Sequence, residues 1–194
     1  DDDRLCFVIG DVSGKGIPAS LFMAVTKTLL RAKATKDVSA GTILSDMNSA
    51  ICEGNETMMF VTFFLAILDV KTGSIEFSNA GHNLPYMIVG KARVEETAEL
   101  HGPPIGVVSD YEYATGRLEM KSGDTIVLYT DGVTEALNEK NDMFDVDGLM
   151  KTLERERASD PKTITKAVIA DVDVFAGSAE QADDIAITVL SYKG

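Results

Sequence analysis

Four aspartates stand beside glycines or turn-forming residues at the ends of apolar runs that lie far apart in the sequence. Asp11 follows the run Leu5–Ile9, Asp131 follows Thr125–Tyr129, and Asp183 and Asp184 precede Ile185–Leu190. If antiparallel strands bring these ends together, mutual repulsion raises the carboxylate pKa values unless cations intervene. Oxygen ligands without a paired His or Cys favour magnesium or manganese over zinc. The pattern therefore indicates a divalent metal site.

A carboxylate-held pair of such ions can supply hydroxide at neutral pH and clamp a phosphoryl group, as two-metal hydrolases do. Aspartates at strand ends are also common turn formers, so a purely structural role remains open on spacing alone. A phosphate-binding P-loop is excluded, because only three residues separate Gly10 from Gly14 and Gly16 follows Lys15. An acidic side chain at Asp11 would also repel phosphate.

Composition limits the classes of partner. The chain has 194 residues, which fits one domain, and its 31 acidic against 18 basic residues give a formal charge of -13. This charge argues against nucleic acid and against insertion into an anionic membrane. Cys6 and Cys52 are expected to be free thiols in a reducing cytoplasm. No apolar run approaches the roughly 18 residues of a membrane span, so a cytoplasmic protein is expected.

Periodicity and turn residues predict the elements that position these carboxylates. Helices are expected over residues 18–34, 39–53, 148–157 and 160–177, and strands over 5–9, 58–69, 74–79, 86–89, 113–120, 125–129 and 185–190. The first helix should bury its face Leu21, Val25, Leu29 and Ala32, and the second Ile43, Leu44, Met47 and Ile51. His82, on a glycine turn, is interpreted as structural, with a role as a metal ligand or general acid left open. His101 is expected to be solvated.

Several motifs occur together in a characteristic order. They are 10–16 (GDVSGKG) with 18–24 (PASLFMA), 59–64 (MFVTFF), 79–83 (NAGHN), 128–136 (LYTDGVTEA) and 181–184 (QADD). Over nearly the whole chain this set resembles the bacterial SpoIIE/RsbU-type serine phosphatases of the metal-dependent protein phosphatase 2C-like superfamily (PPM). The resemblance implies an α+β fold of two stacked antiparallel β-sheets flanked by helices, an α-β-β-α sandwich.

The resemblance also implies roles for individual residues. Asp11 is expected to bridge two Mn²⁺ or Mg²⁺ ions, with the backbone carbonyl of Val12 as a further ligand. Asp131 and Asp183 are expected to complete one ion's ligand set, and these three aspartates form the expected catalytic set. Asp184 is the less favoured ligand of its pair and is expected to orient the site. A metal-activated water is expected to attack a phosphoserine or phosphothreonine in line, without a phosphoenzyme.

The family pattern further implies partners and one departure. The usual substrate is a phosphorylated signalling protein of the STAS or anti-anti-sigma type, and an upstream sensor domain is usual. The family's other acidic ligand lies on a strand before this chain begins, and Asp1–Asp3 match the turn after that strand. Residues 1–194 are therefore expected to be a single phosphatase domain without its first strand and with weakened metal binding. A catalytically weak sensing or scaffolding module, a generic acidic metal-binding domain and a homodimer stay open.

Overall fold

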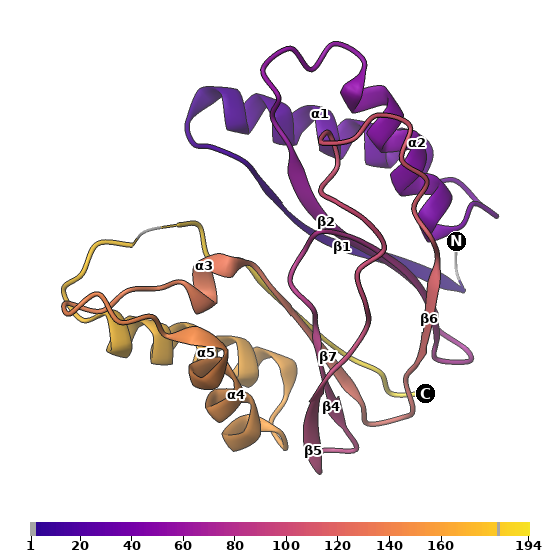
Figure 1. Cartoon of the computed structure of the whole chain (residues 1–194). Helices are drawn as coiled ribbons and strands as arrows, with labels where there is room; N and C mark the ends of the chain where they lie inside the picture. Colours follow the sequence, from indigo (N-terminus) through magenta and orange to yellow (C-terminus); the bar gives the residue numbers. More distant parts are fainter. Residues whose placement is uncertain (1–2, 182) are drawn as a thin grey trace. The chain divides into compact units, whose positions relative to one another are not determined.

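The computed structural model describes residues 3–181 and 183–194, so residues 1 and 2 of the N-terminal turn and Ala182 of the last motif lie outside the described residues. The chain divides into two compact units. The first runs up to His82 and resumes over Ala98–Glu119, and the second comprises Asn83–Thr97 and Met120–Gly194. Each unit contains one antiparallel sheet of four strands with its own helices (Figure 1).

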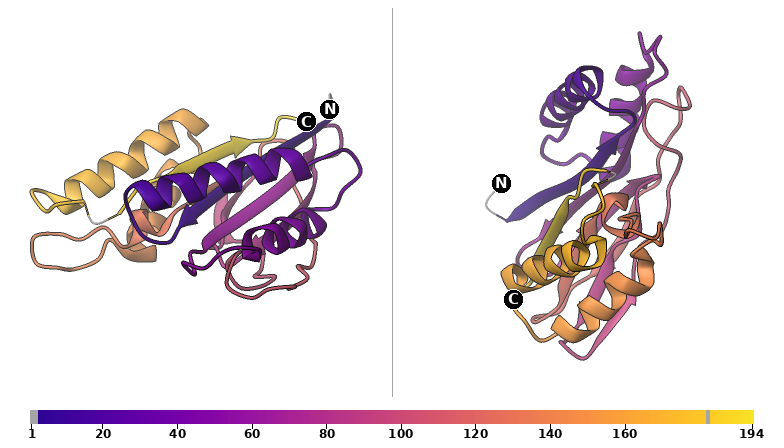
Figure 2. Two further views of the ribbon diagram at one scale, coloured as in Figure 1. Left: turned by 90° about the horizontal axis from the view of Figure 1, so that it is seen from above. Right: turned by 90° about the vertical axis from the view of Figure 1, so that its left-hand side faces the viewer.

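The sheet of the first unit has the strand order β1-β2-β3-β6. Its strands are β1 (Arg4–Val12), β2 (Val61–Asp69), β3 (Ser74–Ala80) and β6 (Gly116–Glu119). Helices α1 (Ile17–Lys33) and α2 (Ala40–Cys52) follow β1 and lie on one face of this sheet, as Figure 2 shows. Ser39 caps α2 by accepting a hydrogen bond from the Thr42 amide, so the helix begins one residue after the predicted start.

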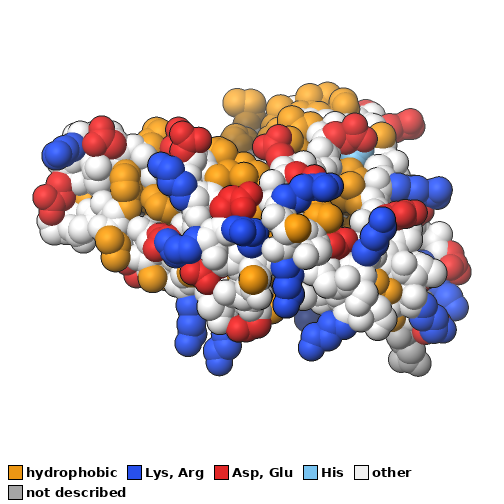
Figure 3. Space-filling view, turned by 90° about the horizontal axis from the view of Figure 1, so that it is seen from below, with side chains coloured by type: hydrophobic (Ala, Val, Ile, Leu, Met, Phe, Trp, Pro, Cys, Tyr) orange, Lys and Arg blue, Asp and Glu red, His pale blue; other side chains and the backbone are white. Residues whose placement is uncertain are grey.

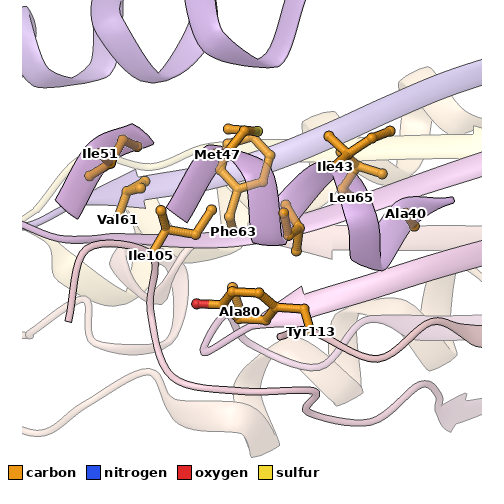
Figure 4. Packing of buried hydrophobic residues seen from close by; sticks show 11 residues of the cluster. Ala40, Ile43, Met47, Ile51, Val61, Phe63, Leu65, Ala80, Ile105 and Tyr113 are labelled. Carbon is orange, nitrogen blue, oxygen red and sulfur yellow. The ribbon is translucent and has the colours of Figure 1, made fainter. Parts of the chain in front are cut away.

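The core of the first unit lies between α2 and the middle of β2 (Figure 4). The predicted inner face of α2 is confirmed, because its four residues are all buried: Ile43, Leu44, Met47 and Ile51. They pack with Val61, Phe63 and Leu65 of β2 and with Ile105 from a loop. This packing fixes β2 beneath α2, and β2 in turn pairs with the Asp11 end of β1.

The buried face of α1 differs from the prediction. Leu21 is 63% exposed, Val25 is 53% exposed and Ala32 is also exposed. Leu29 of the predicted face does pack against the core, together with Phe22 and Leu30. Thr26 lies on the inner face and is satisfied by donating to the Phe22 carbonyl at 2.9 Å. The helix therefore turns toward the core an apolar stripe that is rotated from the predicted one.

The sheet of the second unit has the strand order β5-β4-β7-β8. Its strands are β4 (Tyr86–Val89), β5 (Arg93–Glu96), β7 (Thr125–Tyr129) and β8 (Ile187–Ser191). Its helices are α3 (Asp131–Thr134), α4 (Asp145–Glu156) and α5 (Pro161–Ala176). Ile164, Val168 and Val172 of α5 pack with Val127 and Tyr129 of β7 in a second core. The fold class is therefore confirmed as α+β, with two antiparallel sheets and five helices in the described parts.

Most predicted elements are present, and a few are shifted or missing. Strands β4 and β7 have the predicted bounds, whereas β6 begins at Gly116 and β8 at Ile187, inside the predicted runs. Strand β5 was not predicted, because its sequence Arg-Val-Glu-Glu is charged and lies at the edge of its sheet. Helix α4 begins at Asp145 instead of residue 148.

The expectation that His101 is solvated is wrong. Its side chain is 5% exposed, and its ring lies 5.0 Å from that of Phe77. The Nδ1 atom accepts a hydrogen bond from the Asn79 amide at 3.1 Å. The neighbouring loop 102–106 brings this residue over β3, and a single-sequence pattern carries no signal for that return.

The surface and cysteine chemistry agree with the composition. On the face drawn in Figure 3, Lys and Arg side chains alternate with Asp and Glu, and the described residues there form no continuous basic surface. Cys6 and Cys52 are both free, as expected. None of the described helices is long and apolar enough to cross a membrane.

Candidate functional site

The turn that carries Asp11 is held by its own backbone in the first unit. Asp11 lies one residue before the end of β1, opposite Thr62 of β2. Ser13 and Phe60 then exchange two hydrogen bonds: the Ser13 amide donates to the Phe60 carbonyl at 2.8 Å, and the Phe60 amide donates to Ser13 Oγ at 2.9 Å. Gly14 and Gly16 follow with φ angles of 81° and 79°, which favour glycine.

His82 belongs to a buried hydrogen-bonded group beside this turn. Its side chain is almost fully buried, and Nδ1 lies 2.9 Å from Thr62 Oγ1. Its backbone amide donates to Asn79 Oδ1 at 2.8 Å, while Asn79 Nδ2 donates back to the His82 carbonyl at 3.0 Å. Thr62 Oγ1 also lies 3.4 Å from the Asp11 carbonyl oxygen. These contacts support the interpretation that His82 is structural and helps fix the strand next to Asp11.

Asp131 is placed in the second unit where β7 ends and α3 begins. Its backbone carbonyl accepts from the Glu135 amide at 2.7 Å and from Thr134 Oγ1 at 3.2 Å, which closes the first turn of α3. Its side-chain Oδ1 is buried and has no hydrogen-bond partner among the described residues. Burial of an unpaired polar oxygen costs about 1–3 kcal/mol, so such an atom calls for a ligand. Tyr129, two residues before Asp131, lies in the core of this unit, and burial raises the pKa of its hydroxyl.

The segment that carries Asp183 and Asp184 lies directly against Asp131. A Cβ added at Gly132 would overlap the Asp184 carbonyl oxygen and lie 3.3 Å from that of Asp183. Asp183 Oδ1 accepts from the Asp184 amide at 2.9 Å, and Gln181 Nε2 donates to the Asp183 carbonyl at 2.8 Å. The second unit thus brings together three of the predicted aspartates.

The donor set fits a hard divalent cation. The predicted ligands offer only carboxylate and carbonyl oxygens, which Mg²⁺ and Mn²⁺ prefer. The unpartnered Asp131 oxygen is the observation in this structure that calls for a cation. Asp11 and Val12 belong to the first unit, and their meeting with the carboxylates of the second unit stays a prediction.

Two hydroxyl residues of the site were missed by the sequence interpretation. Ser13 bonds Phe60 as described, and Thr130 bonds the segment next to Asp183 through its side chain. Both stand within two residues of a predicted ligand, at the end of a strand. Ser and Thr are favoured at such junctions because their hydroxyls replace missing backbone partners, and this preference is the signal that could have found them.

Comparisons with known proteins place these features in a family. The model of the family "Stage II sporulation protein E (SpoIIE)" matches residues 1–193. The chain is 28% identical over 168 residues to "Phosphoserine phosphatase RsbU" of Bacillus subtilis, covering 87% of this chain and 50% of RsbU. It is also 28% identical over 180 residues to "Protein IcfG" of Synechocystis, covering 78% of this chain and 28% of IcfG. The chain therefore spans half or less of the length of these two relatives.

Solved structures share the fold. The SiaA-PP2C domain of Pseudomonas aeruginosa matches with a TM-score of 0.88 at 19% identity, covering 100% of this chain and 78% of that domain. RsbX in complex with magnesium matches with a TM-score of 0.68 at 15% identity, covering 97% and 81%. The catalytic domain of PstP with two manganese ions matches with a TM-score of 0.66 at 11% identity, covering 97% and 88%.

The family model covers essentially the whole chain, and the observed sheets and helices match the structures of that family. Homologues of this type hold magnesium or manganese. The chain therefore belongs to the SpoIIE family, and it resembles a phosphoserine phosphatase in sequence and protein phosphatase 2C domains in fold.

Proposed function

We propose that this chain hydrolyses phosphoserine or phosphothreonine on a signalling protein in a manganese- or magnesium-dependent reaction. The observation that carries the proposal is the buried, unpartnered Oδ1 of Asp131 beside the Asp183–Asp184 segment. In a structural turn this oxygen would find a protein donor, whereas a cation satisfies it directly. Membership of the SpoIIE family supports phosphate ester hydrolysis as the chemistry.

The proposed ligands come from the motifs identified in the sequence. Asp11 and the backbone carbonyl of Val12, together with Asp131 and Asp183, would hold the ions. Asp184 orients this set, because its amide holds Asp183 Oδ1. When bound, a pair of such ions activates water for attack and neutralises charge that develops on the phosphoryl group.

Residues around the proposed ligands are proposed to hold the ligand-bearing segments in place. The Ser13–Phe60 pair fixes the turn after Asp11, and the Thr62–His82 contact fixes the strand opposite. No described side chain has a contact that identifies the phosphoprotein. A STAS-type substrate and an upstream sensor domain are therefore proposed from the family resemblance, with RsbU named as a phosphoserine phosphatase.

The test is hydrolysis of an aryl phosphate and of a phosphoserine peptide with and without manganese. Asp131→Asn keeps the shape of the side chain and removes the charge, so manganese-dependent hydrolysis should fall by more than about a hundredfold, the upper range for residues that only orient ligands. Asp173→Asn is the matched control, because Asp173 is exposed on α5 of the same unit. It removes the same charge and should leave activity unchanged.

The same assay separates the enzyme from the alternative. Manganese binding by calorimetry without hydrolysis of either substrate would favour a sensing or scaffolding module. Equal hydrolysis by wild type and Asp131→Asn would refute the proposed site.

A further inference from the structure

Thr130 follows the last residue of β7 and hydrogen-bonds across to the segment before β8 through its backbone and its side chain. The regular ladder between β7 and β8 ends at the pair Tyr129 and Ile187. One step further, the Thr130 amide still donates to the Ala186 carbonyl at 3.0 Å. The pairing of the two chains therefore continues past the last strand residue, toward the Asp183–Asp184 segment.

The carbonyl of Thr130 cannot take part in that continued pairing. It accepts from the Val133 amide at 3.0 Å, because helix α3 begins at the next residue. The Ala186 amide, which would have bonded this carbonyl in a longer ladder, instead donates to Thr130 Oγ1 at 2.9 Å. The side-chain hydroxyl thus replaces the backbone acceptor that the helix has taken away.

The same hydroxyl also donates. Thr130 Oγ1 lies 3.0 Å from the Asp184 carbonyl oxygen and 3.5 Å from that of Ala186, so the shorter contact to Asp184 takes the hydrogen. Thr130 is 2% exposed, so water does not compete for these bonds. Only Ser or Thr offers both a donor and an acceptor at this distance from the backbone.

We propose that Thr130 is a positioning residue that sets the spacing between the metal ligands Asp131 and Asp183. It precedes Asp131 directly, and its hydroxyl holds the residue that follows Asp183. This inference rests on the proposed function, because the two aspartates are taken as ligands. Loss of the hydroxyl frees the 184–186 segment and lets Asp183 move away from Asp131.

The test uses the chain as it is, with manganese binding measured by isothermal titration calorimetry. Thr130→Val is isosteric and removes the hydroxyl, and Thr130→Ala is a smaller second variant without it. Both should weaken manganese binding by about ten- to a hundredfold, the range found for groups that orient metal ligands. Thr130→Ser keeps the donor and acceptor and should restore the wild-type affinity.

A matched control lies at the other end of the same strand pair. Thr125 Oγ1 contacts Ser191 Oγ at 2.6 Å, also between β7 and β8, but at the end away from Asp131. Thr125→Val should lower the unfolding temperature and leave manganese affinity unchanged. Amide hydrogen exchange adds a measurement that needs no metal. The Ala186 amide should exchange faster in Thr130→Val than in wild type, and at the wild-type rate in Thr125→Val.

The outcomes separate this inference from the proposed function. Wild-type manganese affinity in Thr130→Val and Thr130→Ala would overturn the positioning role while leaving the phosphatase proposal intact. Equal weakening by Thr125→Val would also overturn it, because the effect would then be general to the strand pair. Absence of manganese binding by the wild-type chain, with Asp131→Asn indistinguishable from it, would overturn both.

Discussion

Replacement of Gly132 by alanine tests how closely the two segments of the second unit that carry proposed ligands are packed. The added Cβ would lie 2.9 Å from the Asp184 carbonyl carbon and closer still to its oxygen, where ordinary contacts begin at 3.4 Å. The Asp184 backbone must therefore move by about half an ångström to one ångström. Metal–ligand distances tolerate only about 0.2 Å. We expect manganese affinity to fall about ten- to a hundredfold.

The stability of the variant follows from two opposing effects. Overpacking of a close contact lowers the free energy of unfolding by about 1–3 kcal/mol. Alanine in place of glycine in a helix raises it by about 1 kcal/mol. A net loss of up to about 2 kcal/mol lowers the unfolding temperature by about 4–8 °C in a chain of this length. Thermal unfolding in a chelator and calorimetric manganese titration measure the two effects separately.

Gly148→Ala is the control for Gly132→Ala. Its Cβ would lie 2.9 Å from the Phe144 ring, so it overpacks the same unit at a helical glycine but meets a side chain instead of the ligand segment. It should alter stability without altering manganese affinity. Wild-type manganese affinity in Gly132→Ala would show that the segment yields without moving Asp183, and the geometric reasoning would be refuted.

Three further predictions concern hydrogen bonds and protonation. Ser13→Ala removes the acceptor of the Phe60 amide, so it should lower the free energy of unfolding by about 1 kcal/mol and weaken manganese binding. A manganese titration by calorimetry identical to that of wild type would contradict a role in fixing the Asp11 turn. Burial raises the pKa of Tyr113, so the stability that its neutral hydroxyl contributes should be lost as pH rises above about 10. In denaturant titrations at several pH values, the free energy of unfolding of Tyr113→Phe should therefore fall less steeply at alkaline pH than that of wild type. Hydrogen bonds from Thr163 lower the pKa of Asp160, so its capping of α5 should be lost as pH falls below about 4. The free energy of unfolding of Asp160→Asn should therefore depend less on pH in the acid range than that of wild type.

Local chemistry explains which elements the sequence predicts well. Strands β4 and β7 have their predicted bounds because turn residues flank both runs, including Lys121–Asp124 before β7. The start of α5 is equally clear, since Asp160 accepts from two amides and Pro161 follows at the first helical position. Such signals act over a few residues and need no knowledge of the rest of the fold.

The sequence predictions are wrong where contacts with residues distant in the sequence determine which side chains are buried. The face of α1 depends on which stripe meets the sheet, and Phe22 with Leu30 prevails over Leu21 with Val25. His101 is buried because a loop returns over Phe77, which lies far from it in the sequence. Spacing along the chain holds no information on either choice.

The candidate site combines both kinds of information. Glycines and strand ends mark the aspartates that the sequence predicts as ligands. The bonds that hold their neighbours Ser13 and Thr130 come from partners 47 and 54 residues away, Phe60 and Asp184. Sequence motifs therefore predict the charged residues of the candidate site more readily than the residues that position them.

The distribution of satisfied and unsatisfied groups around Asp131 has its own consequence. The amide, carbonyl and hydroxyl of Thr130 are all bonded, and so are the carbonyl of Asp131 and the amide of Asp184. Asp131 Oδ1 is the exception, buried and without a partner among the described residues. A flexible turn would rotate this carboxylate toward a donor, so the bonds around it must be strong enough to keep it in place at a cost of about 1–3 kcal/mol. If Asp131 is a metal ligand as proposed, the site is rigid before an ion binds, and little of the binding free energy goes into ordering this ligand.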